Sequence, residues 1–441
     1  MLRLIGFLLI CLSVPAAAQE PQEQTQTSGS TWTIIHAGTL LTRPGKRPLE
    51  RQSVIIRKGL IEAVRTGYAT AADLAGNGLV RIIDLSDKFV LPGLIDCHTH
   101  LEGEWDAKVK LRRVEQTEAD VALDAAFYAL RTLEAGFTTV RNTGATTRAI
   151  FALRNAINAG KVPGPRIIAA GQPITVTGGH GETHGYVGEV LDTFLSTGTC
   201  DGADDCRRAV RLQVKRGADV IKITATGGVL SETAAGTDQQ FTDAELEAIV
   251  ETAHALGRKV AAHAHGTDGI NAALRAGVDS IDHGSFTDES SIKLFKRTGA
   301  YLVPTVVAGV TVIEMAEQEG FFPPPIRAKA IAVGAQLMKM LGQVNKAGVK
   351  IAFGTDAGVS PHGGNAREFL LMVDAGMTPM ESIVAATINA ADLLGLSDEI
   401  GTIEPGKAAD LVATDASPLA DIAELSRIAF VMKSGEVYRQ D

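Results

Sequence analysis

The feature of this sequence that most restricts its fold is a repeat of short apolar runs, each ending in a turn and followed by a segment with helical periodicity. Such runs recur between residues 93 and 358. Parallel strands alternating with helices in this way predict an α/β fold, a (β/α)8 TIM-type barrel whose functional groups come from the carboxyl ends of its strands. An open doubly wound sheet is the alternative, but polar residues at so many strand ends favour the closed barrel. The runs are GLIDCHTH, FTTVRNTG, RIIAAGQPIT, DVIKITATGG, KVAAHAHG, SIDHGS, YLVPTVV and KIAFGTDAG.

Two of the intervening segments carry clear helix-start signals. In TDAELEAIVETAHAL, Thr242 is followed three residues later by Glu245, the pattern of a capping box. In TPMESIVAATINAADLLGL the same device appears with Thr378 and Glu381, and Pro379 occupies the first helical position. Both segments are therefore predicted to be helices between barrel strands.

Both ends of the chain have a different texture, with short alternating segments separated by Gly and Pro. One such region runs from Trp32 to about Asp84, and another begins at Gly401. Because strands need partners and chain ends often lie close together, we predict one small β-sandwich domain assembled from both ends. The predicted division is residues 31–90 and 399–441 for the β-sandwich domain, and residues 91–398 for the barrel.

The first residues have the layout of a secretory signal peptide. A positively charged start at Arg3 precedes an apolar run over residues 4–14, and small residues follow up to Ala18. This run is shorter than the ~20 residues that a membrane-spanning helix needs. We therefore predict a signal peptide over residues 1–18 and a flexible linker over residues 19–30, with export to the periplasm or beyond and no membrane association after cleavage.

The cysteines leave one question open. Cleavage after residue 18 would remove Cys11 and leave Cys97, Cys200 and Cys206. Cys200 and Cys206 flank the short polar loop CDGADDC and could form a disulfide in an oxidising compartment. Two unpaired thiols are an equally good reading of the sequence.

Composition and charge narrow the class of partner. The chain has 441 residues, of which 45% are hydrophobic, enough for one large core or two smaller ones. Its formal net charge is −9 and no Lys/Arg cluster offers a surface for phosphates, which argues against a nucleic-acid partner. The expected partner is a small-molecule substrate, and an acidic surface also permits a homo-oligomer.

Histidines and a carboxylate stand at the ends of the predicted barrel strands. His98 and His100 are two residues apart, so both imidazoles point to the same side of an extended chain. Residues from separate strand ends converge on one face of a barrel, and this set suits a divalent transition metal, most often zinc. The candidate ligands are His98, His100, Lys222, His263, His283 and Asp356.

Lys222 is the unusual member of this set, because an ammonium group beside a divalent cation would be repelled. A buried lysine must lose its proton, move away or find an anion. One option is a lysine that extends out of the barrel or pairs with an acid. The other is chemical conversion of its nitrogen.

With these motifs the chain resembles the amidohydrolase superfamily. The resemblance is specifically to its imidazolonepropionase-like branch of metal-dependent Xaa-Pro dipeptidases, carboxypeptidases and ochratoxin amidohydrolases. The resemblance covers about Trp32 to Tyr438 and rests on PGLIDCHTH, GADVIKITATGG, VAAHAHG, IDHG, FGTDAG and GTIEPGKAADLV. It implies that Lys222 is carboxylated and that its carbamate bridges two divalent metal ions, with zinc as the expected metal. The ligands implied are His98, His100 and Asp356 on one metal, and His263 and His283 on the other.

The resemblance also implies a reaction, hydrolysis of the amide bond of a small N-acyl amino acid or dipeptide, ochratoxin A among them, by a hydroxide that bridges the metals. Asp356 is the candidate catalytic proton shuttle from the water to the departing amine. Two other functions stay open: a cyclic-amide hydrolase of the imidazolonepropionase type, expected to use one metal and no carboxylated lysine, and a non-catalytic exported metal- or solute-binding protein.

Substrate contacts are predicted from loops at the same face. The loop TVTGGHGETHG contains His180, which by resemblance contacts a substrate carbonyl or carboxylate, and His184, which is either a contact or a surface residue. Ser231 is a candidate in the loop after the fourth strand. Arg367 suits a substrate carboxylate, unless it holds an acid on its own helix. His265 is expected to face away from His263 and to support the ligands.

Overall fold

The computed structural model of the protein describes residues 31–74, 78–194, 196–231 and 236–441. The predicted signal peptide and linker over residues 1–30 lie outside the described residues. In the part of the chain that is described, no helix combines the length and the apolar character needed to cross a membrane.

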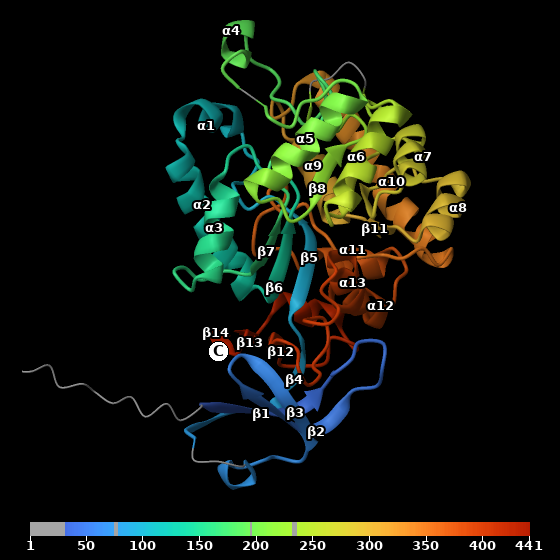
Figure 1. Cartoon of the computed structure of the whole chain (residues 1–441). Coiled ribbons are helices and arrows are strands. Elements are labelled where there is room, and N and C mark those ends of the chain that lie inside the picture. Colours follow the sequence, from blue (N-terminus) through green and yellow to red (C-terminus); the bar gives the residue numbers. More distant parts are fainter. Residues whose placement is uncertain (1–30, 75–77, 195, 232–235) are drawn as a thin grey trace, which may run out of the picture.

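Parallel strands form the centre of the molecule. β5, β6 and β7 pair in one sheet, and β8, β9, β10 and β11 pair in a second sheet. Their amino ends face the chain-terminal sheet, and their carboxyl ends meet at the opposite end of the molecule (Figure 1). The strands are β5 (Leu94–Thr99), β6 (Phe137–Asn142), β7 (Arg166–Ala169), β8 (Ile221–Thr224), β9 (Val260–Ala264), β10 (Ser280–His283) and β11 (Tyr301–Val303).

Two extended segments outside the regular strands close the two sheets into a barrel. After β7, Ile174 forms a parallel bridge to β8. The run KIAFGTDAG bridges β11 through Ile351 and β5 through Ala357. In the same run, the carbonyl of Phe353 accepts a hydrogen bond of 2.8 Å from the backbone N of Cys97 in β5. The eighth strand of the predicted barrel is therefore an irregular extended segment that completes the ring.

Both ends of the chain contribute to one seven-stranded sheet in the order β14-β13-β12-β4-β1-β2-β3. β4 joins the two halves, because it pairs parallel with β1 and antiparallel with β12. Figure 1 shows this sheet below the barrel, with β12 to β14 beside the N-terminal strands. The predicted fold class, a barrel with a small β domain built from both chain ends, is confirmed; the boundaries at residues 90 and 399 stay predictions. The strands are β1 (Trp32–Leu40), β2 (Leu49–Arg57), β3 (Leu60–Thr66), β4 (Val80–Pro92), β12 (Leu411–Thr414), β13 (Phe430–Lys433) and β14 (Glu436–Gln440).

Helices surround the barrel, and most of them bury an apolar face against its strands, whereas α1 and α4 contain no buried residue (Figure 1). They are α1 (Val109–Glu115), α2 (Glu118–Glu134), α3 (Ala149–Asn158), α4 (Gly188–Leu191), α5 (Ala203–Arg216), α6 (Asp243–Ala255), α7 (Thr267–Ala276), α8 (Glu289–Thr298), α9 (Val306–Glu317), α10 (Pro324–Lys346), α11 (Arg367–Asp374), α12 (Pro379–Val384) and α13 (Ala390–Leu394). Shorter helical turns are η1 (Ala71–Asp73), η2 (Ala385–Asn389) and η3 (Ile422–Ser426).

Both predicted capping boxes are present, at the starts of α6 and α12. The second helix differs from its prediction, because a π-helical turn, η2, separates α12 from α13. The carbonyl of Ala385 accepts a hydrogen bond of 3.0 Å from the backbone N of Phe353 in the eighth barrel segment. This contact from another part of the chain occupies a helix carbonyl, which is consistent with the local shift of the hydrogen-bond pattern.

The structure answers the question that the cysteines left open. Cys200 and Cys206 are joined by a disulfide, which ties the segment before α5 to its first turn. Cys97 is a free thiol buried in β5. The disulfide is compatible with an oxidising compartment.

Candidate metal centre

Six side chains at the carboxyl ends of the barrel strands form two groups. Within each group, one nitrogen or oxygen ligand atom of every residue lies within 4.8 Å of the others. The first, called the Asp356 group, contains His98, His100 and Asp356. The second, called the three-histidine group, contains His263, His265 and His283. Sequence patterns far apart in the chain are thus brought to one place by the closed barrel.

In the Asp356 group, one carboxylate oxygen faces two imidazoles. Oδ1 of Asp356 lies 3.3 Å from Nε2 of His98 and 3.1 Å from Nε2 of His100. Nδ1 of His100 donates to the carbonyl of Gly144 at 3.0 Å, which directs Nε2 toward the carboxylate. Burial by itself would raise the pKa of Asp356, but the two histidines hold that pKa well below its usual range. Asp356 is therefore an anion.

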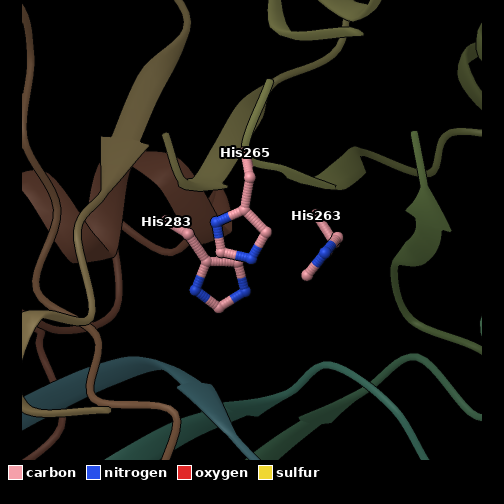
Figure 2. A group of neighbouring side chains, drawn as sticks. All are labelled: His263, His265 and His283. Carbon is pink, nitrogen blue, oxygen red and sulfur yellow. The ribbon is translucent and has the colours of Figure 1, made fainter. Parts of the chain in front are cut away.

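The three-histidine group is electrically different, since its members are neutral. Burial lowers the pKa of His263 and of His283 well below the ordinary histidine value, and it lowers the pKa of His265 to about 3. A neutral imidazole has a lone pair to offer, and this is the form that binds metal ions. Figure 2 shows the rings of the three histidines gathered around one region.

His265 corrects an inference from the sequence. It was expected to face away from His263, but the two ring centroids are 4.7 Å apart. The expectation for His265 was wrong, because residues two apart in an extended chain point to the same side. The same rule correctly placed His98 beside His100. His265 therefore belongs to the buried group.

The ring planes limit how many of these three histidines can bind the same ion. The rings of His265 and His283 are stacked, with an interplanar angle of 17° and centroids 4.9 Å apart (Figure 2). An imidazole lone pair lies in the plane of its ring, so two stacked rings direct their lone pairs along separate planes. The rings of His263 and His283 meet at 72° and can point to one ion. The rings of His263 and His265 meet at 86° and can do so as well, so the ring planes allow either His265 or His283 beside His263 on one ion.

Hydrogen bonds behind the rings determine the tautomer of His283. Its Nδ1 lies 2.7 Å from Oγ1 of Thr305, and that hydroxyl donates to the carbonyl of Pro304 at 2.8 Å. Because the hydroxyl proton is already used, Nδ1 of His283 donates to Thr305 and Nε2 keeps its lone pair. Nδ1 of His265 lies 2.7 Å from Oγ of Ser285, a hydroxyl that can act as donor or acceptor.

Backbone strain is present at the same positions. His283 has φ 70°, Asp356 has φ 57° and Thr305 has φ 49°. Residues other than glycine rarely adopt these left-handed conformations, and strain of this kind clusters at functional sites. The fold holds two candidate ligands and the partner of one of them in conformations that local preference disfavours.

Lys222 lies on β8 and interacts electrostatically with both groups. Burial is the largest influence on its pKa and lowers it, as expected for an ammonium group in the protein interior. Nζ of Lys222 donates to Oδ2 of Asp282, a residue that the sequence reading did not single out. In the form described, Lys222 is therefore paired with an acid, which is one of the two options left open by the sequence.

Asp282 connects the centre to the layer beneath it. Its Oδ2 also lies 3.2 Å from Nδ1 of His98, and its Oδ1 accepts from Nη2 of Arg141 at 3.0 Å. Arg141 is itself fully buried and donates further to the carbonyl of Cys97 at 2.6 Å. The signal that could have revealed Asp282 is its place inside the short apolar run SIDHGS, since a buried carboxylate needs partners.

These residues fit a pair of divalent cations. Imidazole nitrogens and a carboxylate are the ligands that zinc and similar metals prefer, and the histidines of the second group are in their neutral, metal-binding form. Packing so many buried ligand atoms within a few ångströms of one another would leave lone pairs unsatisfied without a cation. The donor set is thus suited to metal ions.

Comparison with known proteins identifies the chain. The sequence model of the amidohydrolase family matches residues 89–438. The chain belongs to the amidohydrolase family. This confirms the resemblance inferred from its motifs, and it makes the protein a hydrolase of amide bonds.

Individual relatives agree with this assignment. Ochratoxinase of Aspergillus niger is 33% identical, and the match covers 96% of this chain and 89% of that protein. Imidazolonepropionase of Rhizorhabdus wittichii is 27% identical, with 85% of this chain and 92% of that protein covered. The crystal structure of a Xaa-Pro dipeptidase with bound methionine in its active site is 41% identical, with a TM-score of 0.88, and covers 92% of this chain and 100% of that one.

The structure places His180 of this amidohydrolase directly against the metal centre. Its ring centroid lies 4.3 Å from that of His263, and its buried Nδ1 has no hydrogen-bond partner among the described residues. Burial lowers the pKa of His180 to about 3. A Cβ atom on Gly228 would lie 2.2 Å from the His180 ring, so only glycine fits there. His184 instead bonds within its own loop, from Nε2 to the carbonyl of Gly179 at 2.8 Å.

The other two predicted substrate contacts lie in different surroundings. Ser231 is buried, and its hydroxyl donates to the carbonyl of Gly228 at 3.2 Å. Arg367 begins α11 and forms a two-point ion pair with Glu314 of α9, at 2.6 and 3.2 Å, rather than with an acid on its own helix. Their contact with a substrate stays a prediction.

Proposed function

We propose that this amidohydrolase uses two zinc ions to hydrolyse the amide bond of small N-acyl amino acids or dipeptides. Its similarity to a Xaa-Pro dipeptidase and to ochratoxinase supports this substrate class, with ochratoxin A as one candidate. The observation that carries the proposal is the pair of ligand groups, one with a carboxylate and one neutral, within electrostatic range of a buried lysine.

In this proposal His98, His100 and Asp356 hold one cation, and His263 and His283 hold the other. Lys222, converted to a carbamate, is shared between them. Carboxylation changes the Lys222 side chain from a cation, which metal ions would repel, into an anion that compensates their charge. It also brings an anionic ligand to the three-histidine group, which has none of its own. When bound, two such cations lower the pKa of a water and polarise the scissile carbonyl.

The proton transfer falls to Asp356. Its carboxylate is ionised in the buried site, so it can accept a proton from the attacking water and deliver it to the nitrogen of the departing amine. Water adds to the carbonyl carbon, the carbon–nitrogen bond breaks, and the products are a carboxylate and an amine. His180, against the ring of His263, is positioned to orient the substrate, and Ser231 and Arg367 are the proposed contacts farther out.

Product detection by mass spectrometry with the zinc-loaded mature protein tests the function. The panel contains Xaa-Pro dipeptides, N-acyl-phenylalanine amides including ochratoxin A, dipeptides with a basic C-terminal residue, and imidazolonepropionate. We expect release of a free amino acid from one of the linear classes. Ring opening of imidazolonepropionate alone would instead favour the cyclic-amide function, and ligand uptake without any product would favour a binding protein.

We also propose that the protein is exported. The layout of the first residues and the disulfide between Cys200 and Cys206 both support this location. Expression of the full chain in a Gram-negative host, followed by cell fractionation and N-terminal sequencing, should yield a periplasmic protein that begins at residue 19. A cytoplasmic protein that retains residue 1 would contradict the proposal.

A further inference from the structure

A second arginine, Arg113, lies near the catalytic end of the barrel and was not among the residues expected to bind substrate. It belongs to α1, which follows the strand that carries His98 and His100. Figure 1 shows α1 and the segment that carries α4 at the end of the molecule away from the seven-stranded sheet. The helix that carries Arg113 therefore lies at the end of the molecule toward which the carboxyl ends of the barrel strands point.

Arg113 contacts the loop that contains His180. Its Nη1 donates to Oγ1 of Thr183 at 2.6 Å, and Thr183 lies three residues after His180. A second contact joins the same two segments, because the hydroxyl of Tyr186 donates to the carbonyl of Lys110 in α1. Since the ring of His180 packs against that of His263, Arg113 is connected to the metal centre through one short loop.

The guanidinium of Arg113 has different surroundings from that of Arg367. Surrounding protein lowers the pKa of its guanidinium, although the side chain keeps an exposed face. Its charge interacts with that of Glu102, and the charge of Glu102 in turn acts on His100. Among the described residues, no acid forms an ion pair with Arg113, whereas Arg367 already holds Glu314 through two contacts. Arg113 is thus an exposed cation, and Thr183 occupies only one of its nitrogens.

We propose that Arg113 binds the carboxylate of the amino acid on the C-terminal side of the scissile amide, so that the enzyme selects substrates with a free carboxylate there. This inference rests on the proposed function. A guanidinium has five N–H donors in a fork that matches a carboxylate, and Thr183 engages only one of its nitrogens. A two-point, charge-assisted pair of this kind is stronger than a hydrogen bond between neutral groups.

The test compares substrates that differ only in this carboxylate. N-acetyl-L-methionine and N-acetyl-L-methioninamide are assayed with the metal-loaded wild type and with Arg113→Met, which keeps much of the side-chain length. We expect kcat/KM for the acid to fall about 10- to 100-fold, mainly through KM, and that for the amide to change little. Arg113→Lys should recover part of the loss on the acid alone, since it restores the charge without the fork.

Two further variants guard against a merely structural effect. Arg112→Met alters the neighbouring residue of the same helix, which is ion-paired with Asp106 at 2.6 Å, and it should affect both substrates equally. Arg367→Met tests the other arginine proposed for the carboxylate. Equal loss on both substrates in Arg113→Met, or a carboxylate-specific loss in Arg367→Met alone, overturns the inference.

A binding measurement separates this inference from the proposed function. Calorimetry with L-methionine and L-methioninamide needs no turnover, and we expect only the acid to bind about 10-fold or more weakly to Arg113→Met. If wild type binds the acid through Arg113 but hydrolyses nothing, the proposed function fails and the carboxylate site stands. If wild type hydrolyses the acid and Arg113→Met prefers the acid over the amide as strongly as wild type does, the carboxylate site is wrong and the proposed function stands. Absence of both binding and hydrolysis overturns both.

Discussion

The Asp356 group and the three-histidine group lie at the same buried end of the barrel, yet they differ in charge. The first contains an ionised carboxylate, and the second contains only neutral imidazoles. A carboxylate among the ligands offsets part of the charge of a buried divalent cation, whereas neutral imidazoles offset none of it. The first group has its own anion, while in the proposed function the second receives one only through carboxylation of Lys222. If the proposal is right, Lys222 is the residue on which binding of the second metal depends most.

The largest effect is expected when the shared lysine is removed. Lys222→Ala should lose at least one of the two metals per chain and lower turnover by about 10³-fold or more, because the second group then has no anion. Metal analysis and intact-mass measurement check this, since the native chain should carry the added mass of one carbon dioxide. A variant with unchanged activity would reject the bridge.

The next effect concerns the carboxylate that only the first group has. Asp356→Asn is nearly the same size and keeps an oxygen ligand, so much of the metal should stay bound. Turnover should fall about 10²- to 10⁴-fold, because the amide cannot take up the proton of water. Metal content measured beside kcat separates the two roles. Retained activity in Asp356→Asn would contradict the role of Asp356 as the proton shuttle.

Within the second group, two neighbouring histidines should respond differently. His263→Gln is expected to lose one metal per chain, whereas His265→Gln should retain both and show a smaller loss of activity. The stacked rings of His265 and His283 cannot both direct a lone pair to the ion held by His263, and the proposed function assigns this ion to His283, whose Nε2 is left free by the contact of Nδ1 with Thr305. Metal stoichiometry after dialysis checks the pair. Loss of a metal from His265→Gln, with retention in His263→Gln, would reverse the assignment.

Asp282 supports the first group and contacts Lys222, so its removal acts on both groups. Asp282→Asn should weaken metal affinity about 10- to 100-fold, as is typical for residues that orient metal ligands. It also leaves Arg141 buried without its anion, at a cost of about 3 to 5 kcal/mol in the free energy of unfolding. Metal titration and chemical denaturation measure the two effects separately. Unchanged affinity would show that Asp282 serves stability alone.

The smallest expected effect is at the hydroxyl behind His283. Thr305→Ala removes the acceptor that fixes the tautomer of His283 and should weaken metal binding about 10-fold. Thr305→Ser keeps the hydroxyl and is the matched control, with affinity close to that of wild type. If both variants bind metal like wild type, the hydrogen bond does not orient the ligand.

Several features of the site could be read from the sequence because they depend on local periodicity. Strand-end positions predicted that His98, His283 and Asp356 lie near one another, since the carboxyl ends of parallel barrel strands share one face. The capping boxes at the starts of α6 and α12 also depend only on residues close together in the sequence, and both were confirmed. Asp282 was missed, because its partners come from three other strands and no local pattern links them.

By itself, the sequence determined the order of strands and helices, the joining of both chain ends in one domain and the residue types available to a metal, because these follow from periodicity and spacing. Only the tertiary structure decided which side chains meet. The ring planes of His265 and His283, the ion pair of Arg367 with Glu314 and the contact of Arg113 with Thr183 all join segments far apart in the chain. Such contacts depend on how the barrel closes and on which direction each loop leaves it, and no stretch of sequence encodes that alone.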